Sequence, residues 1–396
     1  MTVGSIAIVG TGVGGLAAVA LLADQGHAIT LYDQFDKPGL VGSGLVIQPV
    51  GQAVLDRIGA GDVARNLGAR IGRMVGQEVS RGRTVLDVLY DRKGGDRFGL
   101  AIHRASLFHA LYQSATARGI AITTNSAVTG TRVDTSGRWL TLTDGAEAGP
   151  FDLVVDATGA ASKLSPLMAR PLAYGAVWST VDWPCETTLP ADQLTQRYYR
   201  AARMAGVLPL GKIPGDDTPR AAIFWSLPVA AMSAWRTTPL SDWKTEAAAF
   251  WPEFAPFLDR VTSHDDMIVA RYAHGTLARP YGPRIVYIGD AAHRASPQLG
   301  QGANMALLDA MALAEAMRAK PENPLAAYAG MRRWHVRLYQ AMSWAFTPQY
   351  QSDSLWLPWL RDRIMMPVSR IPPMPATLTR LVGGDLIAPL AGVQFP

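Results

Sequence analysis

The 396-residue sequence contains a single cysteine, Cys185, so the chain cannot form an intramolecular disulfide. This fits a reducing compartment, and we expect a cytoplasmic protein. The thiol is either reactive or structural, and we expect a buried structural cysteine. No stretch of about 18 uninterrupted apolar residues occurs, which predicts no integral membrane segment. The N-terminal apolar run lacks a preceding basic region and is broken by glycines, unlike a signal peptide.

Charged residues are also scarce. They make up 17% of the chain against 48% hydrophobic residues, which excludes a disordered protein and suits two domains with large cores. The net charge is +5, but no long basic run with interleaved aromatics occurs, so we expect no nucleic-acid partner. The seven histidines show no metal-ligand spacing, and we expect no metal site. No G-x-S-x-G element of serine hydrolases is present.

A dinucleotide-binding pattern opens the chain. Residues 5–9 form a short apolar run typical of a buried parallel strand, and residues 10–15 fit G-x-G-x-x-G. A helical pattern covers residues 16–25, and a second strand over residues 28–32 ends at Asp33. This order of strand, loop, helix, strand and acid predicts a nucleotide site.

Each position in the pattern answers a physical need. Gly10 permits a tight turn, Gly12 lets the backbone approach a pyrophosphate, and Gly15 lets the helix pack on the strand. The helix N-terminus offers free N–H groups to the phosphates. Asp33 lies at the spacing of a carboxylate that accepts ribose hydroxyls.

A second motif follows about 280 residues later. Residues 284–288 predict a strand that ends at Gly289-Asp290-Ala291-Ala292-His293, and a long helix is predicted from Gln301 to about Ala319. Asp290 is placed to accept a sugar-like hydroxyl, and the N–H groups opening the helix can face electron-rich atoms. Alternatively, Asp290 could be purely structural in a capped strand–turn–helix. His293, which adjoins this segment, could serve simply to anchor the loop.

Together these motifs resemble the single-component FAD-dependent monooxygenases of the para-hydroxybenzoate hydroxylase type, which include salicylate hydroxylase-like and urate hydroxylase-like enzymes. The resemblance spans about residues 3–345. It is carried by residues 10–15 with Asp33, Gly42-Ser43-Gly44-Leu45, Ile102-His103-Arg104 with Leu107, residues 152–159 and, most specifically, residues 289–304.

The resemblance implies an α/β fold: a Rossmann-type FAD-binding domain with an inserted, mostly antiparallel β-sheet substrate domain and a C-terminal helical tail. The residues that it assigns to FAD are Gly10, Gly12, Val13, Gly14, Gly15, Asp33, Gln34, Arg104, Val128, Asp290, Pro297, Gly300, Gly302, Ala303 and Asn304. Asp33 would hold the adenosine ribose, Arg104 would lie beside the phosphates, and Asp290 would contact the ribitol.

The domain boundaries follow from these anchors. We expect the FAD-binding domain to comprise residues 1–75, 97–166 and 269–345, and the substrate-binding domain to comprise residues 76–96 and 167–268. The proline-rich tail, residues 346–396, contains Trp-Leu-Pro-Trp-Leu and could touch a membrane surface or a partner chain. We expect it to pack against the FAD domain instead.

The implied reaction is hydroxylation of a small aromatic or heteroaromatic substrate with FAD, O2 and NADH or NADPH, through a C4a-hydroperoxide of the flavin. No second G-x-G-x-x-G occurs, which favours transient NAD(P)H binding. The alternatives are a related oxidase or reductase, or a non-catalytic FAD-binding protein. A halogenase is disfavoured because Trp-x-Trp-x-Ile-Pro is absent. We expect a monomer or homodimer.

No motif identifies a catalytic group. Tyr199 and Arg200 lie on a predicted strand of the substrate sheet and are candidates, as is Pro297, which would lie near the reacting edge of the flavin. Further candidates for substrate contact are Tyr174, Trp178 and Trp225.

One position departs from the family pattern. The segment that usually reads Ala-Asp-Gly is here Ala157-Thr158-Gly159, so a hydroxyl replaces an acid associated with the pyrophosphate region and NAD(P)H use. Asp156 either compensates in part or only completes its strand. The route of flavin reduction stays open on this ground.

Overall fold

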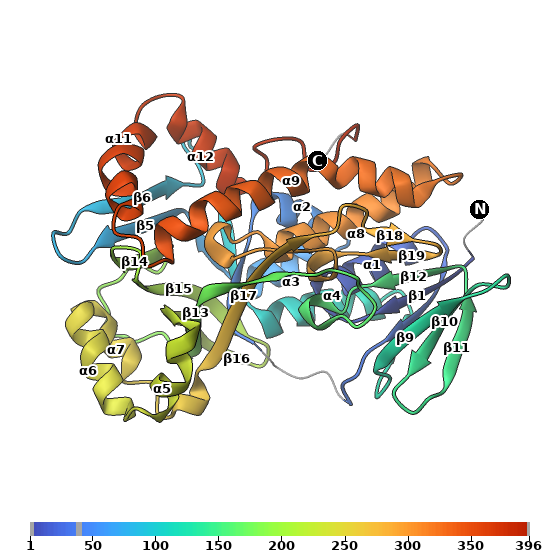
Figure 1. The fold of residues 1–396 in the computed structure, drawn as a ribbon, viewed down its shortest axis with the longest axis horizontal. Coiled ribbons are helices and arrows are strands. Elements are labelled where there is room, and N and C mark those ends of the chain that lie inside the picture. The colour runs from blue at the N-terminus through green and yellow to red at the C-terminus, as the bar shows by residue number, and fades with distance from the viewer. Residues whose placement is uncertain (1–3, 37–41, 394–396) are drawn as a thin grey trace.

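Two β-sheets lie side by side in the computed structural model, and long C-terminal helices run across both (Figure 1). The structure describes residues 4–36 and 42–393. The smaller of the two sheets is almost entirely parallel, and the larger is mostly antiparallel. The α/β fold class predicted from the sequence is therefore confirmed.

The parallel sheet gathers strands from both ends and the middle of the chain. Its six strands lie in the order β18 (Tyr281–Gly282), β19 (Ile285–Tyr287), β12 (Leu153–Asp156), β1 (Ser5–Val9), β2 (Ala28–Tyr32) and β8 (Ile122–Thr123). Only β18 runs antiparallel to its neighbour. The loops after β1, β12 and β19 therefore open at the same carboxyl edge, where ligands bind in such sheets.

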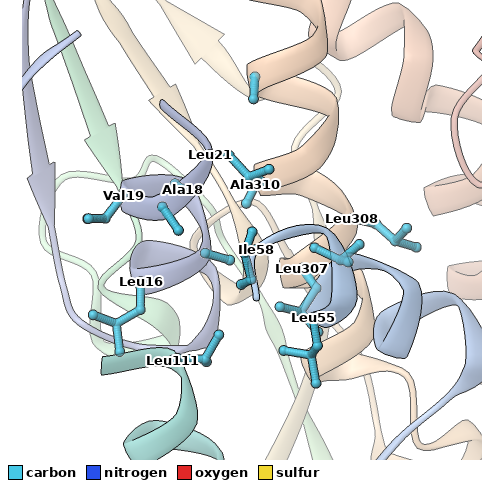
Figure 2. Packing of buried hydrophobic residues seen from close by; sticks show 14 of the residues in the cluster. Leu16, Ala18, Val19, Leu21, Leu55, Ile58, Leu111, Leu307, Leu308 and Ala310 are labelled. Atoms are coloured by element: carbon cyan, nitrogen blue, oxygen red, sulfur yellow. The ribbon is translucent and has the colours of Figure 1, made fainter. Parts of the chain in front are cut away.

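Small residues let the helices beside this sheet approach closely. Helices α1 (Val13–Ala23) and α8 (Gly302–Ala319) contact each other extensively. A Cβ at Gly14 would lie 3.3 Å from the Cβ of Ala306. Figure 2 shows Leu16 and Leu307 among the buried side chains of these helices, and each buried leucine contributes about 1.5–3 kcal/mol. The surrounding helices are α2 (Pro49–Arg57), α3 (Gly61–Leu67) and α4 (Arg104–Thr116).

The larger sheet has eight strands. Their order is β20 (His293–Arg294), β17 (Ile268–Thr276), β13 (Arg170–Asp182), β16 (Asp216–Pro228), β15 (Arg203–Ile213), β14 (Gln193–Tyr199), β5 (Arg73–Glu78) and β6 (Thr84–Leu89). Three helices pack against one face through a tryptophan-rich core: α5 (Met232–Thr237), α6 (Leu240–Phe250) and α7 (Ala255–Leu258). Side chains along a strand alternate between the two faces of the sheet. Residues adjacent in sequence to those in the tryptophan-rich core therefore point to the opposite face.

A three-stranded sheet connects that opposite face to the parallel sheet. Its order is β3 (Gly44–Ile47), β7 (Gly99–His103) and β4 (Ala69–Ile71). Val46 of β3 shares a core cluster with Leu208 and Leu210 of β15. A Cβ at Gly44 would lie 2.2 Å from Cδ2 of Leu210, so a side chain there would have to displace this buried leucine. A further antiparallel sheet contains β9 (Val128–Val133), β10 (Arg138–Leu142) and β11 (Glu147–Phe151).

The C-terminal segment begins inside a long helix, α9 (Pro324–Tyr350), which runs through the predicted boundary at residue 345. It is followed by α10 (Leu357–Leu360), a π-helical turn (Arg361–Met365), α11 (Met366–Ser369) and α12 (Met374–Gly383). The Gln301 side chain donates a hydrogen bond of 3.0 Å to the carbonyl of Val382, and Thr379 donates one of 2.7 Å to the carbonyl of Leu89. The tail thus contacts the loop before α8 and the edge of the eight-stranded sheet.

Three further expectations from the sequence concern the cysteine, membrane-spanning helices and metal sites. Cys185 is exposed, so the expectation of a buried cysteine is wrong. It lies in the connection between β13 and β14, outside the alternating apolar pattern. Within residues 4–36 and 42–393, no helix is long and apolar enough to span a bilayer. The same residues contain no cluster of side chains suited to a metal ion.

Candidate flavin site

The turn after β1 holds its glycines in different environments. Gly10 has φ +99°, and a Cβ there would lie 2.7 Å from the Ala157 carbonyl oxygen. A Cβ at Gly15 would lie 1.9 Å from the Gly10 carbonyl oxygen. Gly12 is exposed, and a Cβ there would lie 3.8 Å from its nearest neighbour, the Ala157 carbonyl oxygen. Gly10 and Gly15 therefore close the turn, whereas Gly12 leaves open the surface that a pyrophosphate requires.

The carboxylate of Asp33 reaches back to this turn. Its Oδ2 accepts hydrogen bonds from the Thr11 N–H at 2.7 Å and the Thr11 hydroxyl at 2.6 Å. Its Oδ1 accepts one from the Gln34 N–H at 2.7 Å. A carboxylate offers about four acceptor positions, so one remains for a ribose hydroxyl. Asp33 can therefore fix the loop and bind the nucleotide at once.

The N-terminus of α8 offers a second set of donors. The helix begins at Gly302 without a side-chain cap, so its first N–H groups have no intrahelical partner. A Cβ at Gly302 would meet no described atom within 4 Å. Asn304 is buried behind this turn, where its Oδ1 accepts from the Gln48 N–H at 2.7 Å and its Nδ2 donates to the Gly300 carbonyl at 3.0 Å. The positive end of the helix thus faces open space.

Asp290 and Arg104 come from different elements, the turn after β19 and the start of α4. Asp290 is accessible to solvent, yet enough protein surrounds it that burial raises the pKa of its carboxyl, an effect opposed by the charges of His293 and Arg104. Arg104 begins α4, and its side chain passes over Gly42, where an added Cβ would lie 2.5 Å from it. No partner for its guanidinium is found among the described residues. It is therefore available to an anion such as a phosphate.

His293 lies behind the loop. Its Nε2 is 2.7 Å from Oδ2 of Asp309, which also accepts the Gly289 N–H at 2.9 Å. Arg332 donates from Nε to Oδ1 of Asp309 at 2.8 Å and from Nη1 to the Pro389 carbonyl at 2.6 Å. These contacts support a role for His293 in anchoring the loop.

The segment after β12 resolves the roles of Asp156 and Thr158. Asp156 is fully buried, and its Oδ1 accepts the Thr158 hydroxyl at 2.6 Å while Oδ2 accepts the Ser162 hydroxyl at 2.5 Å. Burial raises the pKa of Asp156, and these hydrogen bonds oppose the shift. Asp156 therefore holds the following turn and does not present its carboxylate to the Gly10 loop.

Aromatic side chains of the eight-stranded sheet face the β3–β7–β4 sheet. The Trp178 Nε1–H donates to the Tyr272 hydroxyl oxygen at 2.9 Å, and its ring lies 4.5 Å from that of Phe224, centroid to centroid. Trp178 also packs against the cluster that contains Val46 and Leu208. Burial raises the pKa of Tyr272 to about 12, and the charge of Arg104 opposes this shift. Tyr272 is thus a neutral hydroxyl on the same side as Arg104.

Comparison with known proteins identifies the family. A family model described as an FAD binding domain matches residues 4–336. The chain belongs to the FAD-dependent aromatic monooxygenases. FAD is therefore its cofactor. The Gly10 loop and the α8 N-terminus fit that group, because a Cβ at Gly12 would lie no closer than 3.8 Å to a described atom and one at Gly302 would meet none within 4 Å.

Individual relatives include three of note. A Rhodococcus erythropolis protein named as a 2-heptyl-3-hydroxy-4(1H)-quinolone synthase is 30% identical over 79% of this chain and 79% of its own. An FAD-dependent urate hydroxylase of Klebsiella pneumoniae is 24% identical over 78% and 80%. A solved structure of a 2-methyl-3-hydroxypyridine-5-carboxylic acid oxygenase variant matches with a TM-score of 0.77 and 20% identity over 96% and 97%, and supports the fold.

The catalytic candidates of this monooxygenase are not brought together. Tyr199 is 42% exposed at the end of β14, and Arg200 follows it with φ +52° and stacks on its ring. Arg200 is therefore not on the strand where the sequence placed it. Trp225 points to the other face of the sheet, under α6. Of these candidates, only Pro297 lies in the loop between β20 and α8, where it is exposed.

The remaining candidates lie at or near the site. Val13 and Gly14 belong to the first turn of α1. Val128 begins β9 and packs against the cluster that includes Tyr32, beside Asp33. Tyr174 donates to Asp353 at 2.5 Å and so binds the tail. Their roles toward FAD or substrate stay predictions.

Three residues of this arrangement were not singled out from the sequence. They are Gln48, Tyr272 and Asp309. Their partners lie far along the chain: Gln48 contacts Asn304, and Tyr272 contacts Trp178. No local pattern marks such pairs. The position of Gln48 directly before Pro49, the start of α2, was the one available signal.

Proposed function

We propose that this chain hydroxylates a neutral, largely apolar aromatic or heteroaromatic compound that carries a hydroxyl or carbonyl group, with NAD(P)H as electron donor. The overall change is R–H + O2 + NAD(P)H + H⁺ → R–OH + NAD(P)⁺ + H2O. The observation that carries the proposal is the pair Trp178–Tyr272, set among apolar side chains. When bound, FAD takes electrons from NAD(P)H and activates O2 for transfer to carbon.

The residues divide the remaining tasks. The free N–H groups of α8 would stabilise negative charge on the flavin ring, and Arg104 would balance the phosphates. Trp178 and Phe224 would exclude water from the ring face of the substrate. Because Trp178 donates to the Tyr272 oxygen, the Tyr272 O–H is left to donate to a substrate oxygen.

The preference for a neutral substrate rests on charge. The hydrophobic side chains that cluster beside Trp178 are mainly aliphatic or aromatic, and the charge of the buried Arg361 there is paired with Asp362 at 2.6 Å, while its Nη2 has no partner among the described residues. Arg104 is the cation beside Tyr272, and we expect FAD phosphates to occupy it, which leaves it unavailable to a substrate carboxylate. The hydroxyquinolone named for the 30% identical relative is neutral and apolar, which agrees with this preference.

The test is anaerobic mixing of the FAD-loaded protein with NADH or NADPH, with and without hydroxyquinolones, phenols and benzoates. We expect a neutral compound to accelerate flavin bleaching and to yield a hydroxylated product when O2 is admitted. Tyr272→Phe should retain FAD but release more H2O2 per NAD(P)H, whereas Tyr112→Phe on α4 should match the parent. Bleaching accelerated only by aromatic carboxylates would overturn the assignment of a neutral substrate.

A further inference from the structure

The C-terminal segment leaves an unusual amount of apolar surface uncovered. Six large apolar side chains between residues 355 and 371 are exposed, by 44% to 72%: Leu355, Trp356, Trp359, Ile364, Val368 and Ile371. We call these six residues the C-terminal apolar face. Scattered single exposed apolar residues are ordinary, but their concentration in one short segment indicates an interaction surface.

This face is the outer side of a segment that is already docked. The helical run from Leu357 to Ser369 turns Pro358, Arg361 and Met366 inward. Arg361 is 2% exposed, donates to the Gln349 carbonyl at 2.7 Å, and lies over the rings of Tyr198 and Tyr350 at 5.3 and 5.0 Å. The apolar face is therefore not a core-facing surface that has come loose.

Within residues 354–371 the exposed charged side chains have one sign. Arg363 and Arg370 are exposed within the run. The one carboxylate between residues 354 and 371 is Asp362, which is 16% exposed and pairs with Arg361 at 2.6 Å. A second copy docked by twofold symmetry would oppose this face to itself and set arginine against arginine. Anionic lipid headgroups would complement both the arginines and the tryptophans.

We propose that the C-terminal apolar face binds this enzyme peripherally to a bilayer that carries anionic lipid. Tryptophan and aliphatic side chains would enter the headgroup boundary, and Arg363 and Arg370 would contact the headgroups. Figure 1 shows α11 at the end of the molecule beside β5 and β6, so the bound membrane would lie near the edge of the eight-stranded sheet. The proposal does not depend on which compound is hydroxylated.

The test is cosedimentation of the FAD-loaded enzyme with phosphatidylcholine vesicles that contain or lack phosphatidylglycerol, at low and high salt. We expect binding to the anionic vesicles that weakens with salt. Trp356→Ser with Trp359→Ser should weaken this binding roughly tenfold or more. Arg363→Gln with Arg370→Gln should weaken it by about fivefold for each arginine.

The control replaces two apolar residues that are exposed elsewhere, Met168→Ser with Ile268→Ser, and should bind like the parent. Flavin absorbance and melting temperature check that each variant is folded. Absence of parent binding, or equal binding by the tryptophan variant, would overturn the proposal. A further outcome would also overturn it: the parent is a dimer by light scattering and does not bind vesicles, and the tryptophan variant is a monomer. A second copy of the chain would then cover the face.

Discussion

Gly10 and Gly12 lie two residues apart in one loop but answer different demands. Gly10 is required by the protein itself, because its φ is +99° and its neighbour is a backbone carbonyl. Gly12 has φ −66°, which any residue adopts, and a Cβ there would make only an ordinary contact, 3.8 Å from the Ala157 carbonyl oxygen. We therefore propose that a ligand approaching the backbone is what favours glycine at position 12.

This difference predicts opposite defects. Gly10→Ala should lower the free energy of unfolding of the apoprotein by about 2–4 kcal/mol, through backbone strain and overpacking. Gly12→Ala should change it by less than about 0.5 kcal/mol but weaken FAD binding by roughly tenfold or more. Urea unfolding of the apoprotein and fluorescence titration with FAD measure the two quantities. Equal FAD affinity in Gly12→Ala and the parent would contradict the role of Gly12.

At the scale of elements, local sequence patterns predicted several helices and strands, but they did not predict which side chains of distant elements meet. The order β1, α1, β2 and the start of α8 follow from periodicity and glycine placement, and the structure has them. Strand β16 of the larger sheet begins at Asp216, and its polar start carries no alternating apolar pattern that would mark it. The faces of Tyr199 and Trp225 were not predictable, because a shift of one residue reverses the side of a strand.

The link between elements that matters most is buried and charged. Asp309 on α8 joins the Gly289 loop, His293 and, through Arg332, helix α9 and the C-terminal segment. Such pairings combine residues up to 57 positions apart, so the sequence gives no local sign of them. Once one partner is removed, the others remain buried without compensation.

Asp309→Asn should therefore destabilise the fold by about 3–5 kcal/mol. Burial alone would raise the pKa of Asp309, but the charges of His293 and Arg332 outweigh it and lower the pKa to about 2. Since the ordinary pKa is about 4, the carboxylate contributes its full stability above that pH and loses it as the pH falls toward about 2. In urea unfolding at several pH values, the gap between parent and variant should narrow below about pH 4; a gap that widens there would refute this account.

At the scale of the whole molecule, the two large sheets are joined through the β3–β7–β4 sheet and through helices α4 and α9. Val46 and Leu210 meet in a common core, the Ser106 hydroxyl donates to the Lys212 carbonyl at 2.8 Å, and Ser343 on α9 lies 3.2 Å from Nε2 of His274 on β17. In the reaction proposed above, the flavin and the substrate would be held by different sheets, and their separation would have to be fixed. An interface of this kind should make the sheets unfold together.

Two internal probes can test that cooperativity, since flavin fluorescence reports the parallel sheet and the tryptophans of the α5–α7 core report the far face of the larger one. We expect both signals to change at the same urea concentration, although chains above about 150 residues often unfold in steps. Leu210→Ala removes a fully buried side chain from the shared core and should lower both midpoints together, by a loss of about 2–5 kcal/mol. Two separate transitions in the parent protein would mean that the sheets are independent units, and that the Leu210 contact does not fix the substrate relative to the flavin.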